Sequence, residues 1–249
     1  MEVEVIKMLN FKKSYDGKEV HKDVSFYLNK GNCLGLLGGS GAGKSVILRS
    51  LIGLESPDGG SLKVFGEEVS NLSEDDWVEV RKKISYVFQD GALFDSMSVF
   101  ENVAYPLIEH TNLSEDEIKN RVTEVLAEFD LEGTDELMKS ELSGGMQKRV
   151  GLARSIILKP EIILYDEPTA GLDPANTINI QNIILQLKKR GNSSILVTHD
   201  MPTALAVCDD ICLLHEGRIL ARCDASELKT NKDHPINQFM HGAREVFND

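Results

Sequence analysis

Hydrophobic residues near the start of the chain alternate with polar ones, a spacing typical of half-buried β-strands. In "HKDVSFYLN" the alternating positions are Val24, Phe26 and Leu28. The segment "GGSLKVFGEEV" follows a glycine turn and predicts one further strand. Together with the first residues of the chain, these segments predict an antiparallel sheet near the N-terminus.

The apolar pattern then changes twice. "CLGLLG" predicts a short strand and "KSVILRSLIGL" predicts a helix directly after it. From about residue 90 to residue 158 the spacing becomes helical. Ser114 and Glu117 match a capping box at the start of one helix. The face that this helix is expected to bury consists of Ile118, Val122, Val125, Leu126 and Phe129.

Apolar strand patterns return from about residue 160. They are "IILY", "SILVT" and "ICLLH", and helical stretches such as "NTINIQNIILQLKKR" alternate with them. Strand–helix alternation predicts an α/β fold with a parallel sheet. The helical stretch before it is therefore expected to be an insertion into the α/β core.

Composition narrows the class of protein. The 249 residues are 41% hydrophobic, enough for one large domain or a domain with a smaller lobe. A net charge of −13 argues against a nucleic-acid partner, because such proteins usually present a basic field. No apolar run approaches the roughly 18 residues of a membrane helix, and "MEVEVIKMLN" does not match a signal peptide. We expect a cytoplasmic protein that reaches a membrane only through a partner.

The four cysteines are Cys33, Cys208, Cys212 and Cys223, and none forms a C-x-x-C motif. Cys208 and Cys212 are four positions apart, so they could share a helix face and hold a metal ion. No nearby His or Cys completes a ligand set, and small buried thiols are the favoured interpretation.

A glycine-rich segment between the predicted strand and helix carries the first chemistry. "GGSGAGKS" matches the phosphate-loop pattern G-x-x-x-x-G-K-[ST]. Its residues are Gly38, Gly39, Ser40, Gly41, Ala42, Gly43, Lys44 and Ser45. In such a loop Lys44 reaches the β- and γ-phosphates and the Ser45 hydroxyl coordinates Mg²⁺. The strand before and the helix after favour this interpretation over an ordinary glycine turn.

Polar residues follow three of the predicted strands, where a parallel sheet exposes a ligand crevice. Asp166 and Glu167 end "IILYDE". Asp166 suits a water-mediated Mg²⁺ contact, and Glu167 suits a general base for an attacking water. His199 is placed to contact a γ-phosphate, and Gln89 to contact Mg²⁺ and the water. Alternatively, Asp166 and Glu167 are exposed acids at the end of a strand, and His199 has only a structural role.

A second glycine motif, "ELSGGMQKR", also has the character of an anion cradle, although one nucleotide needs only one. Taken together and in this order, the phosphate loop, Gln89, "LSGGM", "ILYDEP", "AGLD" and His199 resemble the ATP-binding cassette (ABC) ATPases. The resemblance covers essentially the whole chain. It implies that ATP and Mg²⁺ are the cofactors.

The resemblance also implies an architecture. We expect a P-loop NTPase (RecA-like) core with an N-terminal antiparallel β-sheet and an inserted α-helical subdomain, together forming one ABC ATPase domain over 1–249. The α/β core would comprise 1–89 and 158–225, and the helical subdomain 90–157. A C-terminal tail would occupy 226–249.

In this family two chains dimerise head to tail, which would explain the second cradle. The residues expected to bind the partner chain's γ-phosphate are Ser143, Gly144, Gly145 and Met146. Asp173 would lie in the loop between the two sites, and Tyr15 would stack on adenine unless it is a core residue. Met146 stands where the family often has Gln, which leaves a polar contact by that side chain open.

The loop after Gln89 is rich in apolar residues, namely Leu93, Phe94, Met97, Val99 and Phe100. They could pack the junction between core and helical subdomain. Alternatively, the resemblance implies a groove for a cytoplasmic helix of a membrane subunit.

One segment narrows the family further. "FQDGALFDSMSVFENV" resembles the ATPases of MCE-associated, Mla-type lipid transporters, and "LSGGM" and "HPINQFMHG" support this. Sugar and amino-acid importers more often have proline where Asp95 stands. The implied partners are an Mla-type permease and, indirectly, an MCE-domain lipid-binding protein, at the inner face of the membrane. An importer ATPase for a polar solute such as an amino acid, and a non-transport ABC ATPase, are the alternatives.

Overall fold

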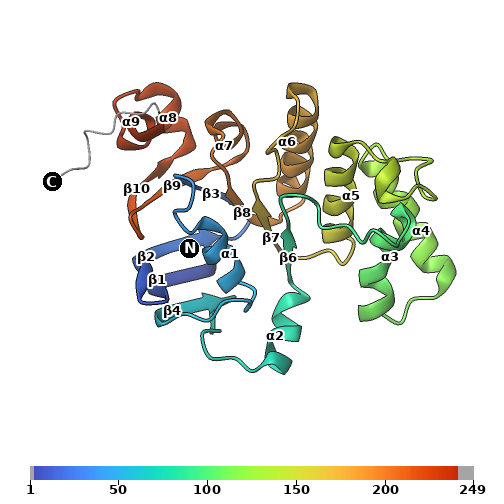
Figure 1. The fold of residues 1–249 in the computed structure, drawn as a ribbon, viewed down its shortest axis with the longest axis horizontal. Helices are drawn as coiled ribbons and strands as arrows, with labels where there is room; N and C mark the ends of the chain where they lie inside the picture. The colour runs from blue at the N-terminus through green and yellow to red at the C-terminus, as the bar shows by residue number, and fades with distance from the viewer. Residues whose placement is uncertain (1–2, 241–249) are drawn as a thin grey trace.

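The computed structural model describes residues 3–240; Met1, Glu2 and residues 241–249 of the expected tail lie outside the described residues. A sheet of ten strands, in the order β5-β4-β1-β2-β10-β9-β3-β8-β7-β6, runs through this part of the chain (Figure 1). The strands are β1 (Glu4–Tyr15), β2 (Lys18–Asn29), β3 (Cys33–Gly38), β4 (Gly59–Val64), β5 (Glu67–Glu68), β6 (Ile84–Val87), β7 (Ile162–Asp166), β8 (Ser193–Val197), β9 (Asp210–His215) and β10 (Arg218–Asp224).

Helices flank the sheet and extend the molecule at both of its ends, with α3 and α4 at one end and α8 and α9 at the other (Figure 1). The helices are α1 (Lys44–Ser50), α2 (Glu74–Arg81), α3 (Val99–His110), α4 (Glu115–Glu128), the short 3-10 helix η1 (Lys139–Glu141), α5 (Gly144–Ile156), α6 (Pro174–Lys189), α7 (Met201–Val207), α8 (Ala225–Thr230) and α9 (Pro235–Met240).

The expected parallel sheet is confirmed in the run β9-β3-β8-β7-β6, where every neighbouring pair is parallel. All residues of β3 and β8 are buried, as a strand covered on both faces requires. Because these strands are parallel, their carboxyl ends meet at one edge of the sheet. The residues expected to carry chemistry follow β3, β6, β7 and β8.

The antiparallel part contains β1, β2, β4 and β5. Val24, Phe26 and Leu28 are buried on β2, as the alternation predicted. The strand expected in "GGSLKVFGEEV" is confirmed as β4, and the segment also contains the two-residue β5, which forms a hairpin with β4. Phe65 and Gly66 join the two strands with φ of 50° and 83°, and two successive positive φ values are what a tight hairpin turn needs.

The segment between β6 and β7 holds α3, α4, η1 and α5 (Figure 1). The capping box is confirmed at α4, where the Ser114 hydroxyl accepts from the Glu117 amide and the Glu117 carboxylate accepts from the Ser114 amide. Ile118, Val122 and Leu126 are buried on one face of this helix. They share a single apolar cluster with residues of β7 and β8, so the helical segment is packed onto the sheet.

The cysteines do not form a metal pair on a helix. Cys208 follows the end of α7 and Cys212 lies in β9, so the shared helix face was a wrong interpretation. Cys33, Cys208 and Cys212 are buried free thiols, and the sulfur atoms of Cys33 and Cys208 lie 3.6 Å apart. Buried thiols were the favoured interpretation, and Cys223 is only half-buried.

None of the helices in residues 3–240 has the length and the apolar character that a membrane crossing requires.

Close backbone contact joins α5 to the loop after β6, and it yields a stability prediction. A Cβ at Gly151 would lie 2.7 Å from the Gly91 Cα and 2.8 Å from its carbonyl oxygen. Gly151→Ala should therefore destabilise the fold by about 1–3 kcal/mol through overpacking. Thermal unfolding measures this, at about 2–4 °C per kcal/mol for a chain of this size.

Gly144→Ala, in the same helix, is the matched control, because a Cβ at Gly144 meets nothing within 4 Å. Equal melting temperatures for the two variants would show that α5 and the loop can separate without cost.

Candidate functional site

The phosphate loop connects β3 to α1 and folds around a buried lysine. Gly41 and Gly43 adopt φ of 75° and 90°, a backbone region that glycine enters without a Cβ clash. The Lys44 ammonium donates to the carbonyls of Gly38, at 2.8 Å, and Gly39, at 3.0 Å. These groups hold the ammonium inside the loop.

Lys44 is only 8% exposed. Burial lowers its pKa, and the nearby carboxylates of Glu167 and Asp166 act in the opposite direction. No carboxylate in the described residues forms an ion pair with the ammonium, which is satisfied by backbone carbonyls alone. A buried cation in a glycine loop is a good fit to a phosphate group.

The last residue of β7, Asp166, is held on both carboxylate oxygens. The Ser45 hydroxyl donates to Oδ1 at 3.0 Å, and the Tyr86 hydroxyl, from β6, donates to Oδ2 at 2.6 Å. Burial, together with the hydrogen bond and charge of Asp166, raises the pKa of Tyr86, so its phenol stays protonated and remains a donor. The sequence analysis did not identify Tyr86.

Glu167 follows Asp166 with φ of 51°. Left-handed backbone at a residue other than glycine is costly and is often found at functional sites. Its carboxylate Oε2 lies 3.0 Å from His199 Nδ1 and accepts from the His199 backbone amide at 3.3 Å. The carboxylate is largely shielded, with a side-chain exposure of 14%, whereas the imidazole is 70% exposed. The histidine thus covers the acid and presents its own ring to solvent.

These groups line one cleft of about 520 Å³ at the carboxyl edge of the parallel sheet. The cleft brings together Gln89, Asp166, Glu167 and His199 with the loop residues Ser40, Gly41, Ala42, Gly43, Lys44 and Ser45. The hydroxyl, carboxylate and amide oxygens of Ser45, Asp166 and Gln89 are the donor type that Mg²⁺ prefers. The residues present therefore fit a magnesium–nucleotide complex.

The second glycine cradle lies elsewhere. Within residues 3–240, no residue of 143–146 lines the cleft. Ser143 caps α5, its hydroxyl accepting from the Met146 amide at 3.3 Å. Next to it, a Cβ at Gly145 would collide with the side chain of Asn176, in the first turn of α6. The Asp173 carboxylate caps that helix by accepting from the Asn176 amide at 3.0 Å.

The cradle and the Asp173 loop are thus neighbours within one chain. Lys148 also donates to the Ala170 carbonyl at this junction. The Gln147 side chain turns inward and donates to the carbonyls of Lys139 and Leu142, at 3.1 and 3.2 Å. Met146 packs against the core cluster. Neither Met146 nor Gln147 is therefore free to make the polar contact that a Gln at position 146 would offer the nucleotide.

Tyr15, the expected adenine platform, ends β1 and is 39% exposed, so the core alternative is wrong. The Lys13 ammonium lies 5.2 Å from the centre of its ring. Tyr15 is not one of the described residues that line the cleft. It is adjacent to the cleft through Arg49, which lines the cleft and interacts with the tyrosine.

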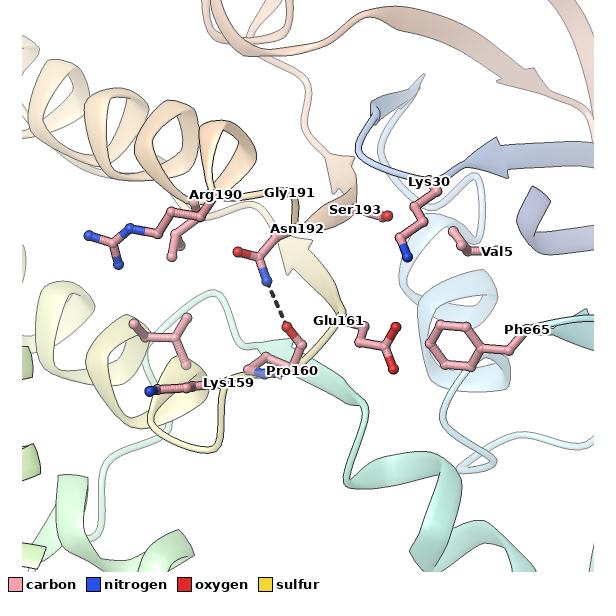
Figure 2. A pocket seen from close by; sticks show the side chains of 12 residues that line it. Val5, Lys30, Phe65, Lys159, Pro160, Glu161, Arg190, Gly191, Asn192 and Ser193 are labelled. Carbon is pink, nitrogen blue, oxygen red and sulfur yellow. Dashed lines mark hydrogen bonds between the residues drawn. The ribbon is translucent and has the colours of Figure 1, made fainter. Parts of the chain in front are cut away.

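A second cavity, of about 540 Å³, lies at the amino ends of β7 and β8, where Glu161 and Ser193 line it (Figure 2). Two of its polar side chains are engaged within the protein. Asn192 Nδ2 donates to the Pro160 carbonyl at 2.6 Å, and Arg190 pairs with Glu128 at 2.6 Å. None of the residues expected to bind ATP or Mg²⁺ lines this cavity.

The chain resembles known proteins over most of its length. A family model described as "ABC transporter" matches residues 21–170. The chain is 40% identical over 233 residues to the probable ribonucleotide transport ATP-binding protein mkl of Mycobacterium tuberculosis (strain ATCC 25618 / H37Rv). That match covers 93% of this chain and 65% of that protein, so the chain spans about two thirds of this relative's length.

A second relative is the intermembrane phospholipid transport system ATP-binding protein MlaF of Escherichia coli (strain K12), 38% identical over 224 residues, with 90% of this chain and 83% of that protein covered. Among solved structures, the dimeric post-hydrolysis state of the ATP-binding cassette MJ0796 bound to ADP and Pi superposes with a TM-score of 0.82. It is 30% identical and covers 88% of this chain and 98% of that chain.

The shielded carboxylate beside His199 leads to a catalytic prediction. Glu167→Gln should retain ATP binding, because Lys44 and the loop are untouched, and should lower the hydrolysis rate by about 10²–10⁴, the usual cost of losing a general base. Phosphate release measures turnover, and a fluorescent ATP analogue measures binding.

Glu161→Gln is the control, since this acid precedes β7 and lines the other cavity. Near-normal hydrolysis by Glu167→Gln would assign the base to another group.

Proposed function

The chain belongs to the ABC transporter family, and on that premise we propose that it is the ATP-hydrolysing subunit of a membrane transporter. One observation carries the proposal. A single cleft joins a buried lysine in a phosphate loop to a shielded carboxylate, Glu167, whose only hydrogen-bonded side-chain partner among the described residues is His199. These groups can bind the phosphates of a nucleotide and activate a water molecule for attack on them.

Each group in the cleft has a distinct role in this proposal. The loop and Lys44 bind the phosphates. Ser45, Asp166 and Gln89 hold Mg²⁺, which when bound neutralises charge on the phosphate oxygens. Glu167 accepts the proton of the attacking water. With a proton on Nδ1, His199 donates to Glu167 and orients it, and its exposed ring, which also lines the cleft, contacts the γ-phosphate.

We place the second glycine cradle across a dimer interface. The residues Ser143–Met146 are not part of their own chain's cleft, yet they adjoin the loop that ends at Asp173. A second copy, turned head to tail, brings its cradle to this cleft and completes the γ-phosphate site. The dimeric form of the related cassette MJ0796 supports this arrangement. ATP then joins the two chains, and its hydrolysis lets them part.

The permease partner is assigned to the surface beside the loop after β6. Leu93 and Val99 are buried and belong to the core. These two residues therefore pack inside the chain and are not available to a partner. Phe88, Phe94 and Ile108 are 43%, 42% and 58% exposed. Phe88 lines a groove of about 210 Å³ between β6 and the helices α3 and α5, and the Phe94 ring packs on Arg154, which lines the same groove. A cytoplasmic helix of a membrane subunit that buries apolar side chains against these exposed residues would hold the chain at the inner face of a membrane.

The cargo we propose is a lipid, with an Mla-type permease and an MCE-domain protein as the assembly. Support comes from "FQDGALFDSMSVFENV" and from the relative MlaF, which is named for phospholipid transport. Asp95, in place of the proline of many importers, pairs with Lys139 at 2.7 Å and so ties this loop to η1. The relative mkl, named for ribonucleotide transport, favours the polar-solute alternative.

Identification of the cargo separates these two functions. Reconstitution of the chain with its permease in phospholipid vesicles should give ATP turnover that rises with a transferable phospholipid. If turnover instead responds to ribonucleotides or amino acids, the lipid assignment fails while the ATPase assignment stands.

The dimer proposal predicts complementation between two inactive chains. Lys44→Ala removes the phosphate-loop cation and Ser143→Arg blocks the second cradle, so each variant alone should be inactive. A mixed dimer has one site with both defects and one intact site. Mixing should therefore restore a measurable fraction of ATP hydrolysis.

Mixed dimers are verified by two affinity tags purified in sequence. If tagged mixed dimers form and remain inactive, either the two cradles act within one chain or a single intact site does not suffice.

The partner proposal predicts a selective loss of assembly. Phe94→Asp places a carboxylate in the apolar surface, and an unpaired buried charge is costly. ATP binding by the purified chain should persist while co-purification with the co-expressed permease fails. The control, Leu220→Asp, changes a residue of similar exposure, 42%, on β10. Normal assembly by Phe94→Asp would move the docking surface elsewhere.

A further inference from the structure

Tyr86 bonds to a residue of the cleft and itself lines the groove. Its hydroxyl donates to Asp166 Oδ2 at 2.6 Å, at the position that would hold the metal ion. Its ring packs against the ring of Phe88, with 4.5 Å between centroids and 40° between planes. Tyr86 and Phe88 both line the groove between β6 and the helices α3 and α5. Tyr86 therefore links a residue of the cleft, Asp166, to the groove.

The hydroxyl restricts a carboxylate that has two equivalent oxygens. Asp166 can turn about its side-chain bonds, and only one oxygen at a time faces Ser45. With Oδ2 held by Tyr86, Oδ1 stays directed at the Ser45 hydroxyl, 3.0 Å away. Hydrogen-bond partners of metal ligands fix ligand orientation in this way, and their loss typically costs about 10–100-fold in metal affinity or activity.

Phe88 connects Tyr86 to the solvent-exposed part of the groove. Phe88 is 43% exposed, so its ring packs on Tyr86 from the solvent side and is open to displacement by whatever enters the groove. The backbone of Tyr86 is fixed in β6, which pairs with β7. Movement is therefore confined to the tyrosine side chain, and a change at Phe88 reaches the hydroxyl that holds Asp166.

We propose that Tyr86 is a positioning residue that fixes Asp166 for the metal ion, and that Phe88 makes this position depend on the groove. The inference rests on the proposed function, because it deepens how the same cleft holds Mg²⁺ and how a partner in the groove alters that hold.

The first test uses the purified chain and reads metal binding directly. Bound Mn²⁺ is titrated by electron paramagnetic resonance in the presence of ADP, for the native chain and for Tyr86→Phe, which keeps the ring and removes the hydroxyl. The metal concentration at half-saturation should rise about 10-fold or more, whereas ADP binding without metal should stay unchanged. Tyr105→Phe, an exposed tyrosine of α3, is the control and should match the native chain.

An unchanged Mn²⁺ titration for Tyr86→Phe overturns the positioning role. Failure of the native chain to bind ADP and metal at all is a different result, since it overturns the proposed function itself.

The second test addresses the link to the groove. Phe88→Ala removes the ring that packs on Tyr86 and should shift the Mn²⁺ titration in the same direction, by less than Tyr86→Phe. Phe94→Ala removes another exposed ring beside the groove, one that packs on Tyr105 at 5.3 Å, and should leave the titration unchanged. Equal titrations for Phe88→Ala and the native chain overturn the link.

Discussion

The parallel pairing of β3 with its neighbours is the constraint on which the site depends. Parallel strands end at the same edge of a sheet, so residues that are far apart along the chain come together there without any direct sequence relationship. β3 ends at the phosphate loop, β7 at Asp166 and Glu167, and β8 two residues before His199. The apolar sequences of these strands bury them on both faces, and that burial fixes the positions from which three polar loops converge.

The same constraint explains why one chain carries two anion cradles. Most of the residues that line the cleft end or follow a parallel strand at this edge. The cradle at Ser143 instead lies at the start of α5, so the length of that helix separates it from β7. It lies beside the first turn of α6. It is therefore directed at a different surface from Lys44. In our account a second copy brings the cradle and the cleft together, so ATP binding and association of the two chains become one event.

Sequence patterns predicted the buried elements and the strand-end residues well, because both follow from local spacing. β2, β3, the capping box of α4, and the meeting of Gln89, Glu167 and His199 in one cleft were all predictable. Elements with little burial were missed: α2 buries only Trp77, although Ser73 and Asp76 form a capping box there. The bond from Tyr86 to Asp166 spans 80 positions and depends on the pairing of β6 with β7, so no local pattern indicates it.

The central claim is that the phosphate loop of one chain meets the cradle of another. Disulfide cross-linking tests it directly, with chains carrying Ser40→Cys mixed with chains carrying Ser143→Cys, both in the Glu167→Gln background. Three native cysteines are buried and Cys223 is half-buried, so chains without the introduced cysteines give the background. The account predicts an ATP-dependent cross-linked dimer in the mixture. A cross-link that forms within single chains carrying both substitutions, and never between chains, would contradict it.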